Sequence, residues 1–138
     1  MFSSTANAFR IAHPTDVTTT LLNEIDYFQA PTGGIGGVGR DSRGAASLTK
    51  LTAAEIALIK KNWRTSAVND EAFKVAGEAA RFLTWTGTPP GGTTKGSAYE
   101  AVIVHGTYVY FVFWFASADT AAAELTVFKE MLSTFEFA

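Results

Sequence analysis

Histidine, cysteine, serine and carboxylate side chains perform most protein chemistry, and this chain of 138 residues places few of them where they could cooperate. The chain has no cysteine, which excludes a thiol nucleophile, a disulfide and a thiolate metal site. His13 precedes a proline and His105 precedes a glycine, and both positions are typical of turns. The thirteen acidic residues form no directed pair, and no G-x-S-x-G motif is present. These patterns support catalysis only weakly, and we expect no cofactor and no metal.

The glycine-rich segment 31–47 contains a literal match to a known ligand motif. Three of its glycines fit G-x-G-x-x-G, and two arginines follow them. The residues are Gly34, Gly36, Gly39, Arg40 and Arg43. A dinucleotide site needs such glycines between a buried strand and an apolar helix, whose N-terminus meets the pyrophosphate. Here Arg-Asp-Ser-Arg-Gly follows instead. We predict a flexible surface loop, with a weak anion site as the alternative.

The aromatic residues are more informative than the ionisable ones. Eleven Phe, four Tyr and three Trp exceed what a small two-layer core needs. Read with period two, segment 107–115 places Tyr108, Tyr110 and Trp114 on one face of a strand. The candidate ligand or interface residues on this and neighbouring strands are Trp85, Glu100, His105, Tyr108, Tyr110 and Trp114. Two interpretations stay open: this face packs under the early helices as core, or it forms a self-association surface or an apolar pocket.

The strands are predicted from β-branched and aromatic runs. Segment 107–115 has no polar face, which indicates the central strand of a sheet. Tight-turn residues at His105-Gly106 precede it, and a proline- and glycine-rich loop at 87–97 separates the two strands before that. We therefore expect an antiparallel meander of 79–86, 99–105 and 107–115, with edge strands near 9–11 and 134–137.

Three helices are predicted, near 16–28, 53–64 and 118–133. The first rests on the four-residue spacing of Val17, Leu21 and Ile25. Three consecutive threonines in the same segment are β-branched and favour a strand instead. The second begins with a capping box of Thr52 and Glu55.

The third predicted helix carries the apolar stripe Leu125, Phe128 and Leu132, which we expect to cover the odd-numbered face of segment 107–115. Segment 66–78 fits either a helix or a strand. The prediction is a single α+β domain over residues 1–138, with flexible loops at 31–47 and 87–97.

Composition limits the classes of partner. A net charge of −2 with scattered basic residues does not favour nucleic acid. The longest dense apolar run, 109–116, is far shorter than the ~20 residues of a membrane-spanning helix. We expect a cytoplasmic protein with no nucleic-acid or membrane partner.

Both ends of the chain resemble the PsbP/Mog1-like group of α+β proteins. The opening Phe9-Arg10-Ile11-Ala12-His13-Pro14 is similar to that group's first strand and its proline. The order of strand 107–115, helix 118–133 and final strand 133–137 is similar to the group's ending. The resemblance covers under half of the chain and implies an accessory or binding role, mostly without catalysis. It carries over no functional residue, because the matched positions are core positions.

Two functions follow as expectations. The first is a small binding or interaction protein, a homodimer or the partner of another protein, associating through the aromatic sheet face. The second is a small-molecule-binding or catalytic cup around Tyr108, Tyr110, Trp114 and His105, with a small apolar ligand.

Overall fold

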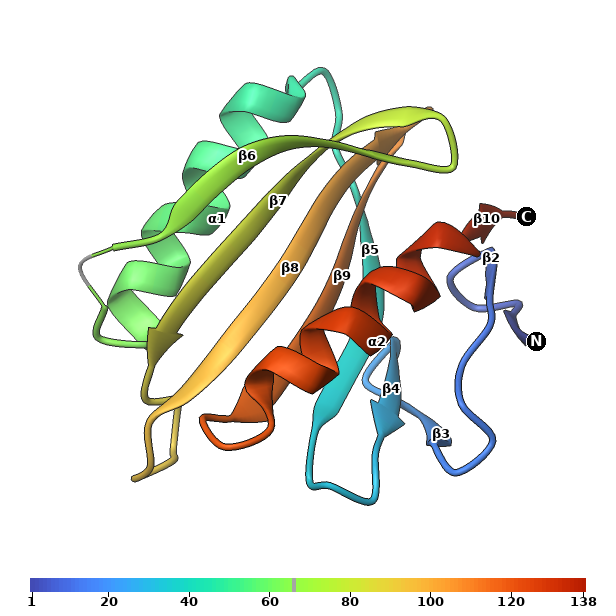
Figure 1. Cartoon of the computed structure of the whole chain (residues 1–138). Helices are drawn as coiled ribbons and strands as arrows, with labels where there is room; N and C mark the ends of the chain where they lie inside the picture. Colours follow the sequence, from blue (N-terminus) through green and yellow to red (C-terminus); the bar gives the residue numbers. More distant parts are fainter. Residues whose placement is uncertain (66) are drawn as a thin grey trace.

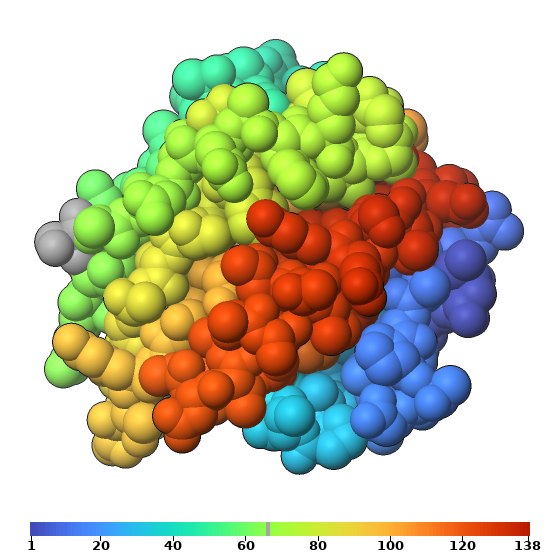
Figure 2. All heavy atoms as spheres, in the orientation of Figure 1, coloured from blue at the N-terminus to red at the C-terminus, as the bar shows by residue number. Residues whose placement is uncertain are grey.

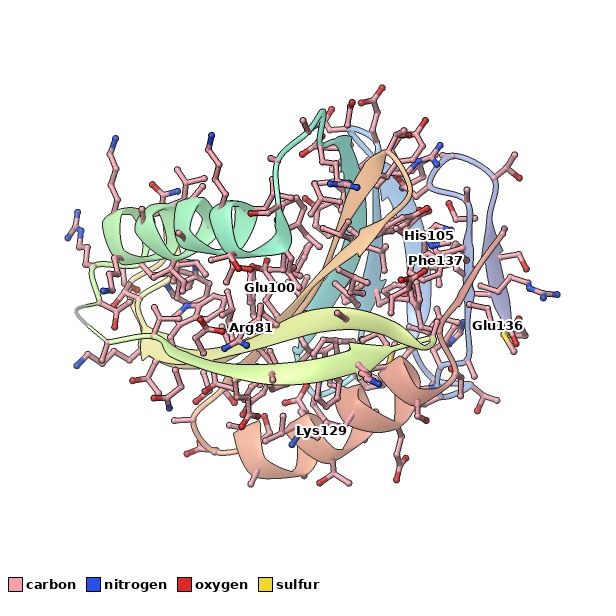
Figure 3. The ribbon with its side chains drawn as sticks, turned by 90° about the horizontal axis from the view of Figure 1, so that it is seen from above. Arg81, Glu100, His105, Lys129, Glu136 and Phe137 are labelled. Carbon is pink, nitrogen blue, oxygen red and sulfur yellow. The ribbon has the colours of Figure 1, made fainter. Side chains whose placement is uncertain are left out.

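The computed structural model describes residues 1–65 and 67–138, and in this part of the chain it contains two helices and two antiparallel sheets. The large sheet has strand order β3-β4-β5-β9-β8-β7-β6, and the small sheet has order β1-β2-β10. One helix packs on each face of the large sheet (Figures 1 and 3). The predicted α+β class is therefore confirmed.

The elements in chain order are β1 (Phe2–Ser4), β2 (Phe9–Ile11), β3 (Thr18–Leu22), β4 (Ile25–Gln29), β5 (Ile35–Ser42), α1 (Leu48–Asn62), β6 (Asn69–Val75), β7 (Glu78–Gly87), β8 (Gly96–His105), β9 (Tyr108–Ser117), α2 (Ala121–Ser133) and β10 (Glu136–Phe137). No helix in the described residues is long and apolar enough to cross a membrane.

Strand β9 lies in the middle of the large sheet, as its composition predicts. It pairs with β5 on one side and with β8 on the other, so that Val112 lies between Val38 and Ala101. The predicted meander is present as β7-β8-β9. Gly106, with φ of 58°, takes the left-handed conformation that the tight β8–β9 turn requires.

The helices cover the opposite faces from those predicted. Helix α2 packs on the even-numbered face of β9, where Phe128 and Leu132 share a core with Tyr110 and Trp114. In the space-filling view, α2 (red) runs between the β6–β7 hairpin (green to yellow) and the N-terminal strands (blue) (Figure 2). Period two predicts which β9 residues share a face, but the path of the connecting chain decides which helix covers that face.

Helix α1 covers the odd-numbered face of β9. Ile59 and Trp63 of α1 form a second core with Val109, and Phe115 packs against it. The Trp63 ring lies edge-on to Phe115, with ring centroids 4.8 Å apart. The Phe111 ring also packs at the edge of this core.

The helix predicted at 16–28 is wrong, because β3 and β4 form a hairpin there. Leu22 pairs with Ile25, which leaves a two-residue turn in which Asn23 and Glu24 have φ of 49° and 66°. Two successive positive φ values are typical of a type I′ turn, the turn that matches strand twist. The three β-branched threonines outweigh the four-residue apolar spacing.

The flexible loop predicted at 31–47 is also wrong for most of its length. Strand β5 occupies residues 35–42 and pairs with β9 along its whole length. Its glycines make room for aromatic rings: a Cβ added to Gly36 would lie 2.2 Å from Cε3 of Trp114, and one added to Gly37 would lie 2.5 Å from Cζ of Phe113. The large neighbouring rings, which only the pairing brings close, explain why glycine occupies this strand.

The predicted start of the second helix, residue 53, is five residues too late. Helix α1 begins at Leu48, and Oγ of its N-cap Ser47 accepts a hydrogen bond from the Lys50 amide at 3.2 Å. The expected capping box is absent, because Thr52 lies inside the helix and is buried. The ambiguous segment contains β6 at 69–75, while residue 66 lies outside the described residues.

The two predicted edge strands exist, but they belong to the small sheet. Strand β2 pairs with both β1 and β10, so that Phe9 lies opposite Phe137. The Phe9 ring stacks on Phe135, with centroids 5.4 Å apart, and joins the α2-side core. The N- and C-terminal segments therefore close one end of the domain together (Figure 1).

Candidate functional site

The aromatic face of β9, for which the sequence left both a core and an interface or pocket open, is the protein core. Tyr110 and Trp114 are 2% and 1% exposed beneath α2. Trp114 Nε1 donates a hydrogen bond to Glu124 Oε1 at 3.1 Å, and the Tyr110 hydroxyl donates to the Ala8 carbonyl oxygen at 3.3 Å. Both polar tips are therefore satisfied inside the molecule, and this face offers no binding surface.

The other predicted site residues are divided between the two faces of the sheet: Tyr108 and His105 lie at one end of this face, whereas Trp85 and Glu100 lie on the opposite, α1 side. Trp85 is buried on the α1 side, edge-on to Trp63 with centroids 5.4 Å apart. Tyr108 is 37% exposed and packs under Arg40, whose Cζ lies 4.1 Å from the Tyr108 ring centroid. The expected cup therefore does not form.

The glycine motif does not have phosphate-binding geometry. Gly36 and Gly39 belong to β5 and lie in its ladder with β9, whereas a phosphate loop turns from a strand into a helix. Arg40 Nη2 donates to the Ala6 carbonyl at 3.2 Å, and Arg43 Nε donates to the Gly106 carbonyl at 2.7 Å. Both arginines bind backbone oxygens rather than converge on an anion site.

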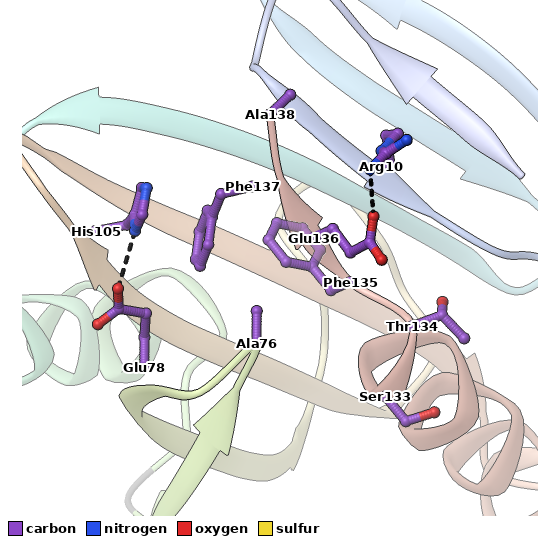
Figure 4. Close-up of a pocket in the computed structure, with 10 residues that line it drawn as sticks. All are labelled: Arg10, Ala76, Glu78, His105, Ser133, Thr134, Phe135, Glu136, Phe137 and Ala138. Carbon is purple, nitrogen blue, oxygen red and sulfur yellow. Dashed lines mark hydrogen bonds and ion pairs between the residues drawn. The ribbon is translucent and has the colours of Figure 1, made fainter.

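His105 lies at an open groove of about 690 Å³ beside the C-terminal strand (Figure 4). Its ring stacks on Phe137 at a centroid distance of 3.8 Å, and its Nδ1 lies 3.0 Å from Glu78 Oε1. Across the groove Arg10 pairs with Glu136 at 2.6 Å. The ionisable side chains of His105 and Arg10 are therefore already paired with Glu78 and Glu136, which favours a structural role in holding β10.

The strongest candidate site lies on the other side of the sheet, around Glu100 of β8. A cleft of about 250 Å³ opens beside this residue, between α1 and the β3–β4 hairpin; we call it the Glu100 cleft. Its lining residues come from the hairpin, β5, α1, β8 and β9, and are Asn23, Glu24, Ile25, Gly39, Arg40, Asp41, Glu55, Glu100, Phe111 and Phe113. In the register of the sheet Glu100 lies beside Phe113, on the face that α1 covers (Figure 3).

Glu100 differs from the other buried carboxylates of the described chain. Asp26 Oδ2 accepts hydrogen bonds from Ser4 and Asn7, each at 2.6 Å. Glu124 accepts from Trp114 and also from Thr32 and Thr120. Glu100 is only 7% exposed, yet its Oε1 has no hydrogen-bond partner. A buried unpaired polar group destabilises a fold by about 1–3 kcal/mol, so such a group is a candidate for function.

The electrostatics of the cleft favour a proton on these side chains. Burial, and then the nearby Glu55 charge, raise the pKa of Glu100 well above its ordinary value. Burial, and then the charge of Asp41, raise the pKa of Glu55. Perturbed carboxylates in a cleft are typical of functional sites, although ion-pair networks produce them too.

The geometry suits binding better than metal coordination. The described residues contain no group of three or more His, Asp or Glu side chains placed to hold a metal ion. Phe111 and Phe113 provide aromatic walls, and Gly39 leaves space beside them. A concave, partly apolar cleft with a few polar groups is the usual form of a small-molecule site.

Three residues of this cleft were among the candidates from the sequence: Glu100, and Gly39 and Arg40 of the glycine-rich segment. Asp41, Glu55, Phe111 and Phe113 were not among them, because these residues come from three elements, β5, α1 and β9, and β5 was expected to be a loop. One signal was available: Glu100 interrupts the otherwise apolar run 98–104 in a strand that is buried on both faces.

No protein-family model matches the sequence, and no curated protein matches it. Solved structures do match it in fold. The cyanobacterial PsbP (CyanoP) of Synechocystis sp. superposes with a TM-score of 0.71 and 13% identity, over 99% of this chain and 91% of that chain. The predicted PsbP/Mog1-like fold is therefore confirmed.

Two further structures share the fold. LpqN of Mycobacterium tuberculosis, which is involved in cell envelope biogenesis, matches with a TM-score of 0.68 and 10% identity over 94% of this chain and 83% of that chain. A protein from Bacteroides thetaiotaomicron matches with a TM-score of 0.68 and 15% identity over 99% of this chain. This chain spans only 47% of the Bacteroides protein.

Proposed function

We propose that this protein is a small accessory protein that binds a ligand in the Glu100 cleft. The observation that carries the proposal is the Glu100 carboxyl, which is buried, lacks a partner at Oε1 and lines a cleft with two aromatic walls. A ligand group that bonds to Oε1 would remove the cost of leaving that oxygen unpaired. A binding role also agrees with the accessory role that the PsbP-like resemblance implies.

Ligand screening by NMR tests this proposal on the full chain. When small fragments from a library are added, we expect the backbone amide chemical shifts of residues around Glu100, Phe111 and Phe113 to change. Gly39→Leu should abolish these changes, because the leucine side chain would fill the cleft. The fold has room for this side chain, since a Cβ added at Gly39 would meet only Ile25, at 3.5 Å. Ser42→Leu adds the same side chain at an exposed position of β5 and should have no effect.

The outcome decides the proposal in either direction. Fragment shifts that cluster at the cleft and disappear in Gly39→Leu support it. A screen in which no fragment perturbs the cleft, or in which Gly39→Leu leaves the shifts unchanged, contradicts it.

The edge strand β3 favours a second function, self-association by strand pairing. All five residues of β3 are exposed and none is charged, and Leu21 and Leu22 are 55% and 57% exposed. The opposite edge, β6, carries Asp70, Glu71 and Lys74, as protected edges commonly do. An uncharged exposed edge can pair with a second copy of the chain.

Light scattering measures this association directly. We expect a mass above that of the 14.8 kDa monomer at micromolar concentration, and a return to the monomer mass in Leu21→Lys. Lys74→Leu, which alters the other edge, serves as the control and should not abolish the association. A monomeric wild-type protein would remove this second candidate and leave the cleft proposal untouched.

A further inference from the structure

We propose that the ligand of the Glu100 cleft is a small organic cation, a protonated amine on a short apolar or aromatic body. This inference rests on the proposed function, since it names the ligand class of the same cleft. It is carried by three features of the lining residues: an excess of carboxyl groups over basic groups, an unpaired buried carboxyl oxygen and aromatic side chains.

The lining has more carboxyl groups than basic groups. Its ionisable residues are Glu24, Asp41, Glu55, Glu100 and Arg40. Within residues 1–65 and 67–138, none of the four carboxylates forms an ion pair. A cationic ligand would provide the missing charge.

Arg40 does not pair with these carboxyl groups. Its position in β5 lies beside Tyr110, on the α2 side of the sheet, whereas Asp41 lies beside Val109 on the α1 side. The guanidinium stacks over Tyr108 and donates to a backbone carbonyl of the N-terminal segment. Arg40 therefore contributes backbone and not its charge to the cleft.

The neighbouring strand supplies no free cation either. Arg81 of β7 lies on the same face of the sheet as Glu100, beside Val102. Its Nε donates to Asp70 Oδ1 at 2.7 Å, so its charge is already paired at the β6 edge. Lys60 and Lys61 are exposed at the far end of α1 from Glu55.

The shape of the cleft suits the rest of such a ligand. Phe111 and Phe113 provide ring faces, which attract cations as well as apolar groups. Ile25 and the Gly39 backbone complete an apolar wall. At about 250 Å³ the cleft lies below the roughly 300–1,000 Å³ of sites for drug-sized ligands, which indicates a ligand with few non-hydrogen atoms.

The carboxyl groups of the cleft favour an ammonium ligand over a metal ion and over an anion. An ammonium needs acceptors, which Glu100 Oε1 and the nearby carboxylates offer, and it tolerates an aromatic neighbour. A divalent metal needs several ligands that converge at fixed distances, and no such group exists in the described chain. A carboxylate or phosphate would meet like charges.

Proton release accompanies binding in this scheme. Without ligand, burial and the charge of Glu55 hold a proton on Glu100 to a higher pH than usual, since they raise its pKa. The positive charge of a bound ammonium lowers that pKa, and the proton leaves to the solvent as the ion pair forms. The affinity for an amine should therefore rise with pH until the amine itself loses its proton.

Calorimetric titration of the intact protein with benzylamine tests this inference. Benzyl alcohol has the same shape without the charge, benzoate carries the opposite charge, and calcium chloride tests for a metal site. We expect benzylamine to bind at least about tenfold more tightly than benzyl alcohol. Its affinity should rise with pH as long as Glu100 of the free protein keeps its proton, and then level off. The enthalpy should depend on the buffer, as proton release requires.

Variants separate the cleft from other acidic surfaces. Glu100→Gln keeps the shape of the side chain and should weaken benzylamine binding about tenfold to a hundredfold. Glu55→Gln removes a carboxylate of α1 that is only partly buried, so it tests the same site should Glu100→Gln fail to fold. Glu71→Gln, at an exposed position of β6, should leave binding unchanged.

Each result distinguishes this inference from the proposed function. If benzyl alcohol or benzoate occupies the cleft as tightly as benzylamine, the ligand class is wrong and the binding role stands. If calcium binds and Glu100→Gln abolishes that binding, the amine is likewise the wrong ligand class, and the binding site stands. If nothing binds in the cleft, neither benzylamine nor any member of the fragment library, both proposals fail.

Discussion

Replacing Glu100 with glutamine should change how the stability of this protein depends on pH. The substitution preserves the shape of the side chain and removes one titrating group from the α1-side core. Burial, and secondly the charge of Glu55, raise the pKa of Glu100 well above its ordinary value of 4.5. The native state therefore binds this proton more tightly than the unfolded state does.

The sign and the slope follow from linkage. Below pH 4.5 both states hold the proton, and Glu100 makes no pH-dependent contribution. Above that value the unfolded state has lost the proton while the native state keeps it, so stability falls as pH rises. Each pH unit lowers the free energy of unfolding by about 1.4 kcal/mol until the native pKa of Glu100 is reached. The Glu100→Gln variant lacks this term, so its stability relative to wild type should increase with pH and then level off.

Urea denaturation measured from about pH 4 to pH 8 checks this prediction. Wild type, Glu100→Gln and the control Glu71→Gln are compared at each pH. Glu71 lies exposed on β6, so its variant should follow the wild-type curve. The reasoning would be refuted if Glu100→Gln ran parallel to wild type over the whole range, or if its relative stability fell as pH increased.

Three further predictions concern the packing of the domain. Gly36→Ala should lower the free energy of unfolding by about 1–3 kcal/mol or more in calorimetry, because the new Cβ would lie 2.2 Å from the Trp114 ring; an unchanged melting temperature would contradict the packing described for β5. Glu124→Leu should cost about 1–3 kcal/mol and alter tryptophan fluorescence, since Trp114 Nε1 loses its acceptor. Phe137→Ala should speed amide hydrogen exchange in β2 and β10 while exchange in β8 stays slow, because the Phe137 ring stacks on His105 and joins the two sheets; uniform acceleration would argue against a local role.

Local composition determined a large part of the fold. The β-branched and aromatic run of β9, the Gly106 turn before it and the apolar stripe of α2 each have one stable local solution. These elements were predicted within a few residues of their observed bounds. The prediction failed where two local patterns competed, as in the threonine run of β3.

Strand β5 shows what local reasoning cannot supply. Glycine has no preference for strands, so segment 35–42 reads as a loop in isolation. Its strand conformation depends on Phe113 and Trp114 of β9, whose rings fill the space that β5 side chains would need. Those rings are more than seventy residues away along the chain, so only the tertiary pairing explains the glycines.

The candidate site, like strand β5, depends on tertiary contacts. The sequence alone determined that Glu100 lies in an apolar strand, but it left the aromatic face of β9 open between core and surface. The tertiary structure decided that Tyr110 and Trp114 are core, and it brought Asp41, Glu55 and Glu100 into one cleft from β5, α1 and β8. The physical reason is that burial and neighbouring charge act through space, so the pKa of Glu100 depends on contacts that no local pattern encodes.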